Sequence, residues 1–110
     1  MELRCEKVQG VQIVHVKGSI DGATAEKFGQ DINMVLGSND QQFVLDLTDL
    51  QYINSAGLRV LLAMAKSVNK RGGRCVLCGL SEGVRNVIEL AGFHRILNIS
   101  PTLDDALLQW

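Results

Sequence analysis

The sequence has no apolar run of about 18 residues, so it offers no candidate transmembrane helix. The segment Met1–Lys7 mixes charges where a secretory signal peptide needs an apolar stretch. There is also no excess of charge of either sign, since the formal net charge is -1. That balance removes the usual electrostatic reason for binding nucleic acid or an anionic membrane. These absences predict a cytoplasmic protein without a nucleic-acid or membrane partner.

Cysteine is scarce, and the three cysteines present do not form a recognisable metal site. In the cytosol they are expected to be reduced thiols. Cys75 and Cys78 have the Cys-x-x-Cys spacing, but the segment Arg74–Cys78 has the pattern of a buried strand, in which residues three apart point to opposite faces. No second Cys or His pair completes a zinc site. The two thiols are therefore predicted to pack in the core.

The sequence does contain enough apolar residues to form one hydrophobic core. The chain has 110 residues, of which 46% are hydrophobic and 21% charged, a composition typical of a globular domain. No repeat, linker or low-complexity segment divides it. We therefore expect a single domain over residues 1–110.

Hydrophobic periodicity predicts an α/β fold with about five strands and about four helices. Short apolar or alternating runs predict strands at Leu3–Val8, Val11–Lys17, Phe43–Leu47, Cys75–Cys78 and Ile96–Ile99. Apolar residues three and four apart predict helices at Thr24–Leu36, at Ser55–Lys70, from the N-cap Ser81 to Ala91, and from Pro101 to Leu108.

The connections between these elements predict a mixed sheet. Gln9-Gly10 suits a tight hairpin turn, which makes the first two strands antiparallel. The later strands alternate with helices, which favours parallel crossovers. Residues 18–22 and 48–54 are predicted to be loops.

Catalytic motifs are sparse. The two histidines, His15 and His94, lie in a predicted strand and a predicted loop. Ser55 follows a strand and precedes a helix, as a hydrolase nucleophile does, but its surroundings lack the first glycine of Gly-x-Ser-x-Gly. No glycine-rich phosphate loop with a following lysine is present. The sequence is therefore interpreted as that of a protein that is not an enzyme, and an enzyme with a Ser55 nucleophile is the remote alternative.

The stretch from Asp46 to Leu62 is the most informative part of the chain. A buried strand leads through a loop to a small hydroxyl residue at a helix start. Taken alone, this pattern means that Asn54 or Ser55 caps the helix and that Gly57 permits close packing of its first turn.

The whole chain, in order, resembles the STAS domain family (sulfate transporter and anti-sigma-factor antagonist), especially its small stand-alone bacterial members. Those proteins have an Asp-Leu-x-x-Leu stretch after an apolar strand, an aromatic–apolar pair and then Asp-Ser-x-Gly-Leu. The matching segments of this chain are Gly18–Asp21, Asp46–Leu50, Tyr52–Leu58, Gly72–Gly73 and Ala91–Phe93.

The resemblance implies a partner switch. In such proteins the unphosphorylated antagonist binds an anti-sigma factor that is also a serine kinase, and so frees a sigma factor. The kinase phosphorylates the serine that matches Ser55, the complex dissociates, and a serine phosphatase resets the switch. ATP and magnesium belong to the kinase, so no cofactor is expected in this protein. A monomer is expected, because the protein exchanges partners. The alternative is a STAS subunit of a transporter or of a secretion-regulating assembly that is not phosphorylated.

The resemblance also implies the residues involved. Ser55 is the expected phosphorylation site, and the expected partner-binding residues are Asp21, Asn54, Ser55, Ala56, Gly57 and Arg59. For Arg59, which lies one helical turn beyond Ser55, the alternative is a solvated surface arginine. Asn54 departs from the family pattern, which has Asp or Ser at this position. Asn caps a helix as well as Asp does but supplies no negative charge to the kinase site. Asp21 is expected to lie near Ser55 and to offer that carboxylate, or else to form a turn or cap.

Overall fold

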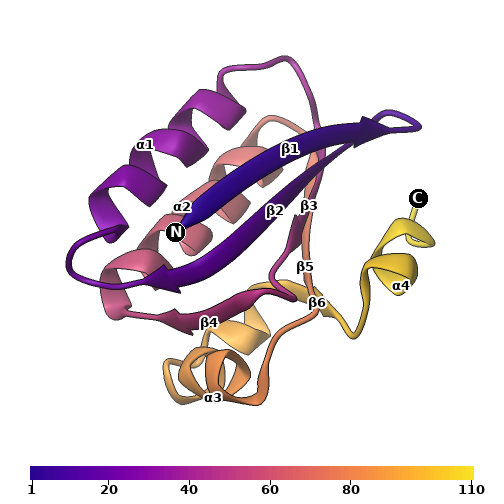
Figure 1. Cartoon of the computed structure of the whole chain (residues 1–110). Helices are drawn as coiled ribbons and strands as arrows, with labels where there is room; N and C mark the ends of the chain where they lie inside the picture. The colour runs from indigo at the N-terminus through magenta and orange to yellow at the C-terminus, as the bar shows by residue number, and fades with distance from the viewer.

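A mixed six-stranded sheet lies at the centre of the protein, in a computed structural model that describes residues 1–110 (Figure 1). Five strands follow the order β1-β2-β3-β5-β6, and β4 pairs with the end of β2. The first pair is antiparallel and all others are parallel. The strands are β1 (Glu2–Val8), β2 (Val11–Ile20), β3 (Gln42–Asp46), β4 (Leu50–Ile53), β5 (Arg74–Cys78) and β6 (Asn98–Ser100).

The predicted α/β class and mixed sheet are confirmed, but one strand was missed. Residues 50–53, expected in a loop, form β4, and β2 continues through Gly18 to Ile20 instead of ending at Lys17. The buried residues of β4, Leu50 and Ile53, are three positions apart, so the strand lacks the period-two signal on which the prediction depended. The last strand begins two residues later than predicted, after a 3₁₀ turn at Phe93–Arg95.

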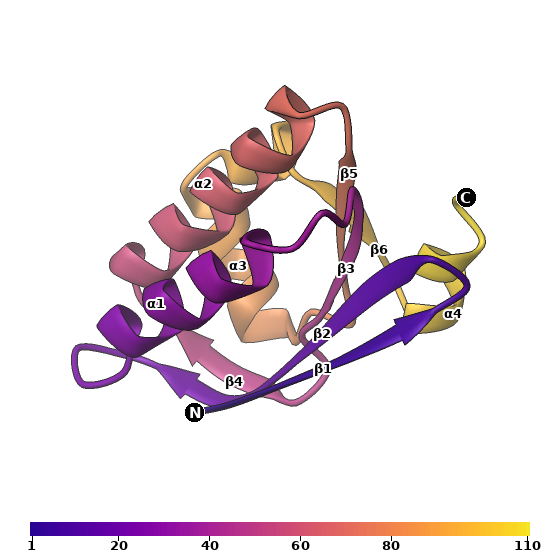
Figure 2. The same ribbon diagram turned by 90° about the horizontal axis from the view of Figure 1, so that it is seen from above.

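Four helices cover the two faces of the sheet, as expected. Helices α1 (Ala25–Leu36), α2 (Ser55–Lys70) and α3 (Glu82–Leu90) lie on one face, and the short α4 (Leu103–Leu107) lies on the other (Figure 2). The predicted cap of the third helix is confirmed, because Ser81 Oγ accepts a hydrogen bond from the Val84 N–H. None of the helices is both long and apolar enough to cross a lipid bilayer.

The buried hydrophobic side chains form two clusters of unequal size. Twenty lie between the sheet and the first three helices, and six lie beneath α4. Cys75 belongs to the larger cluster and Cys78 to the smaller, so the predicted opposite facing of these thiols is confirmed. Burial raises the pKa of each to about 12, which keeps both protonated at neutral pH.

Gly57 lets the first turn of α2 approach the sheet closely. A Cβ atom at this position would lie 2.7 Å from Ile20 Cγ2 and 2.8 Å from Ile53 Cγ1. Both isoleucines are almost fully buried, so neither can move aside. The close packing expected of Gly57 is therefore confirmed, and it fixes α2 on the ends of β2 and β4.

We expect Gly57→Ala to destabilise the protein by about 1 kcal/mol. Overpacking of a dense core costs about 1–3 kcal/mol, which exceeds the gain of up to about 1 kcal/mol from replacing a helical glycine. The matched control is Gly83→Ala in α3, where a Cβ meets no atom within 4 Å, so only the gain remains. Urea unfolding measures both changes, and equal signs would contradict this account.

Candidate functional site

The candidate site lies where two parallel strands end side by side. Ile20 of β2 pairs with Ile53 of β4, and the Asn54 N–H donates to the Ile20 carbonyl at 2.9 Å. Asp21 and Asn54 are the next residues of the two strands, so they follow neighbouring strand ends. The sequence-based expectation that the loop of Asp21 lies beside the start of the second helix agrees with this arrangement (Figure 1).

Asn54, and not Ser55, caps α2. Its backbone is extended, its side-chain Oδ1 accepts from the Gly57 N–H at 2.9 Å, and its carbonyl accepts from the Leu58 N–H at 3.0 Å. These bonds leave the N–H groups of Ser55 and Ala56 as the unpaired donors of the first turn. The sequence left open which of the two residues caps the helix, and the geometry decides for Asn54.

Ser55 is the first residue of the helix and is exposed to solvent. Its hydroxyl makes no hydrogen bond within the chain, because the capping bond comes from its neighbour. A modifying enzyme can therefore reach this oxygen without breaking any contact of the fold. The two unpaired N–H groups and the positive end of the helix dipole favour an anion at this position.

Asp21 has a structural task of its own. One carboxylate oxygen accepts hydrogen bonds from the Ala23 N–H at 2.9 Å and from the Thr24 hydroxyl at 3.2 Å. These bonds shape the turn that leads into α1. The carboxylate of Asp21 thus stabilises a turn, which was the alternative role expected from the sequence. Its second oxygen has no hydrogen-bond partner within the chain.

Two side chains extend the exposed surface around Ser55. Arg59 follows Ser55 by one helical turn, is exposed and makes no ion pair within the chain. Tyr52, three residues before Ser55 on β4, is 51% exposed. Tyr52 is not among the expected partner-binding residues, because residues 48–54 were predicted to form a loop. The signal available in the sequence was a lone tyrosine three residues before the predicted helix start.

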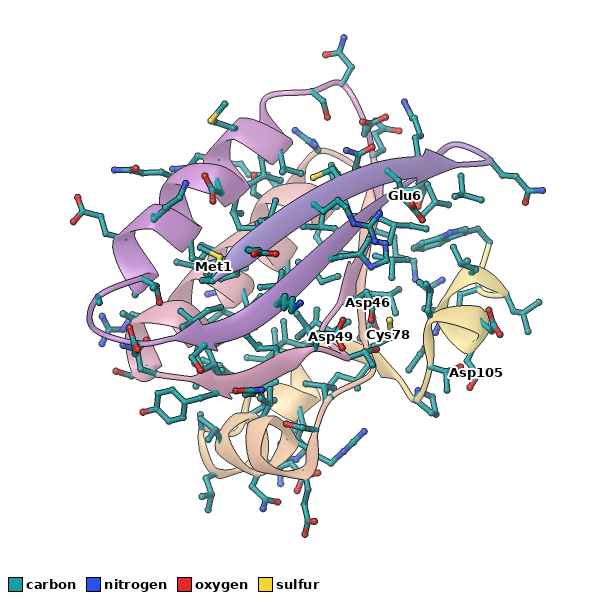
Figure 3. The ribbon with its side chains drawn as sticks, viewed as in Figure 1. Met1, Glu6, Asp46, Asp49, Cys78 and Asp105 are labelled. Carbon is teal, nitrogen blue, oxygen red and sulfur yellow. The ribbon has the colours of Figure 1, made fainter.

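The loop that leads into β4 is held by Asp46. One of its carboxylate oxygens accepts from the Thr48 N–H and hydroxyl, and the other lies 2.7 Å from His15 Nδ1. Burial opposes ionisation of this carboxyl, yet the Thr48 and His15 contacts together hold its pKa below the usual value. Figure 3 shows Asp46 and Asp49 at the two ends of this loop, beside Cys78. The loop therefore sets where β4 begins.

Comparison with known proteins agrees with this geometry. The family model described as "STAS domain" matches residues 2–106. The chain belongs to the STAS domain family. The resemblance noted from the motifs is thereby confirmed over nearly the whole chain.

Three similar proteins are named as anti-sigma factor antagonists. BtrV of Bordetella bronchiseptica, provisionally named as an anti-sigma factor antagonist, is 36% identical over 96% of this chain and 91% of its own length. The anti-sigma F factor antagonist of Paenibacillus polymyxa is 26% identical over 99% of this chain and 94% of its own length. The crystal structure of an anti-sigma factor antagonist from Mycobacterium paratuberculosis superposes with a TM-score of 0.90, at 31% identity, over 97% of this chain and 91% of that one.

We expect Asn54→Ala to lower the free energy of unfolding by about 1 kcal/mol, because it removes the cap of α2. The matched variant Ser55→Ala, one residue later, should change it by less than about 0.5 kcal/mol, since the serine hydroxyl is exposed and makes no bond. Urea titration with circular-dichroism detection measures both. A larger loss in Ser55→Ala than in Asn54→Ala would assign the cap to Ser55.

Proposed function

We propose that the protein is an anti-sigma-factor antagonist that acts by binding in the cytoplasm, and that phosphorylation of Ser55 switches its binding off. The unphosphorylated form binds an anti-sigma factor that is also a serine kinase, and a serine phosphatase restores that form. The observation that carries the proposal is the exposed hydroxyl of Ser55 at the start of α2, relieved of capping by Asn54. The names of the relatives point to the same class of partner.

The fold tolerates the modification. A phosphate adds about -1.5 to -2 charges and three acceptor oxygens. At the N-terminus of α2 the helix dipole stabilises that charge by about 0.3–1 kcal/mol, and the N–H groups of Ser55 and Ala56 are available to the new oxygens. This local gain is present in both the free and the bound protein. It therefore accounts for an unchanged fold but not for a change in affinity.

The interface with the partner decides the affinity. A thousandfold weaker complex needs only about 4 kcal/mol. Burying a charge without a counter-charge costs that much or more, and the bulk of the phosphate acts in the same direction. The partner-contacting surface in this proposal comprises the exposed or partly exposed residues that flank the hydroxyl: Asp21, Asn54, Ser55, Ala56 and Arg59, with Tyr52 added from the structure. Gly57 is buried and contributes by holding the first turn of α2 against the sheet.

The decisive test is phosphorylation and binding with the cognate kinase. We expect the kinase and ATP to label the wild type on one residue and Ser55→Ala on none, as read by mass spectrometry. Ser55→Ala should bind the kinase persistently, and Ser55→Glu should bind it at least about 100-fold more weakly, which corresponds to about 2.7 kcal/mol. The matched control is Ser67→Ala, another exposed serine on α2, which should behave like the wild type. Uptake of phosphate by Ser55→Ala would disprove the site.

We further expect Asn54→Asp to be phosphorylated faster than the wild type. Asp preserves the cap but places a carboxylate beside the hydroxyl, where it can orient the hydroxyl or an ion in the kinase site. Initial rates at equal kinase concentration measure the effect, and unfolding curves verify that stability is preserved. Equal rates would mean that Asp21 or the kinase itself already supplies the negative charge.

A further inference from the structure

The β1 strand forms one complete edge of the sheet. It has seven residues and pairs on one side only, with β2. The strand at the other end of the sheet, β6, has three residues, and β4 has four. An unpaired edge presents a row of N–H and C=O groups that can accept another strand. β1 is therefore the place where such pairing would be longest.

The edge is regular and contains neither a bulge nor a proline, although four of its seven residues are charged. Its pairing with β2 runs without a bulge from Glu2↔Lys17 to Val8↔Val11, and the single proline of the chain, Pro101, lies elsewhere. The two-residue turn Gln9-Gly10 has positive φ at both positions, which makes Val8 and Val11 a hydrogen-bonded pair. Since the pattern alternates, the backbone groups of Leu3, Cys5 and Lys7 point outward from the sheet.

The charges along this edge are complementary to those of its own antiparallel copy. Arg4 and Glu6 lie on the same side of the strand, are exposed and form an ion pair with 3.3 Å between Nη1 and Oε2. A two-fold axis at Cys5 sets Arg4 of each copy opposite Glu6 of the other. An axis at Arg4 or at Glu6 sets two identical charges face to face, which is unfavourable. An axis at Leu3 sets Arg4 opposite Glu2 but pairs only the first half of the strand, whereas the axis at Cys5 pairs the whole of β1. A two-fold axis midway between two residues sets outward-pointing backbone groups of one copy opposite inward-pointing groups of the other, so no hydrogen bonds form.

We propose that a second copy of this chain docks on the β1 edge, antiparallel and centred on Cys5. The two sheets then continue into one another, and the two α1 helices lie on the same face of the joined sheet. This proposal departs from the monomer expected from the sequence.

Apolar surface beside the edge adds to the contact. An open hollow of about 580 Å³ lies between β1 and α1, and its apolar lining comes from Met1, Leu3, Met34 and Val35. Met34 is 79% exposed and lines this hollow together with Met1, Leu3 and Val35, so the apolar side chains form a contiguous patch beside the edge. Docking of a second copy would cover part of this surface.

The edge is separate from the Ser55 site. β1 and β4 lie on opposite sides of β2, and α2 begins directly after β4 (Figure 1). Pairing through β1 therefore leaves both Ser55 hydroxyls accessible. Because of this separation, failure of the self-association test would leave the proposed phosphorylation switch untouched.

Charge reversal tests the proposal by sedimentation velocity across micromolar to millimolar concentrations at low salt. We expect a monomer–dimer equilibrium for the wild type. Arg4→Glu and Glu6→Arg should each raise the dissociation constant at least about tenfold, because each creates two like-charged pairs. The double variant Arg4→Glu/Glu6→Arg should return to within about threefold of the wild type. The controls Lys66→Glu and Glu89→Arg, exposed on α2 and α3, should leave it unchanged.

Disulfide trapping tests the register in a Cys5→Ser background, where the remaining thiols are buried. Opposed residues 4 and 6 form a non-hydrogen-bonded pair with Cα atoms about 4.5 Å apart, within the range of a disulfide. Mixed Arg4→Cys and Glu6→Cys chains should cross-link faster than either chain alone. A wild type that remains monomeric at about 1 mM, a double variant that stays dissociated, or faster cross-linking of Arg4→Cys with itself would overturn the proposal.

Discussion

Direct packing of the first turn of α2 on the ends of β2 and β4 is the constraint on which the site depends. The contact is possible because Gly57 has no side chain where Ile20 and Ile53 lie closest. It is completed by the hydrogen bond from Asn54 N–H to the Ile20 carbonyl. Together these contacts hold the start of the helix at a defined place on the molecule, with its first side chain in solvent.

This placement divides the work between two adjacent residues. Asn54 is partly buried, and its side chain accepts a hydrogen bond from the first turn of the helix. Ser55 is exposed, and its side chain makes no hydrogen bond within the chain. In the proposed function, a group added to Ser55 therefore changes the surface that a partner meets and leaves the core unchanged. A switch of this kind needs no second conformation, because the added charge and volume act directly at the contact.

Much of the fold was predictable from the sequence, and the exceptions have physical reasons. The long helix Ser55–Lys70 was predicted with correct bounds because its apolar residues follow the helical period and its ends carry a cap and glycines. β4 was missed because its buried residues are three apart, and this also hid Tyr52 as a surface residue. The site residues were named from family motifs. Hydrophobic periodicity could not decide whether Asn54 or Ser55 caps the helix, because the answer depends on one side-chain hydrogen bond, from the Gly57 N–H to Asn54 Oδ1.

The assignment of the cap to Asn54 leaves position 55 free to accept other residues. Since the Ser55 side chain makes no contact that the fold needs, alanine, aspartate or glutamate can replace it with little change in stability. Under the proposed switch, alanine at this position gives a chain that binds persistently and glutamate gives one that binds weakly, on the same scaffold. In that proposal, regulation by phosphate depends on one exposed residue and is independent of the stability of the fold.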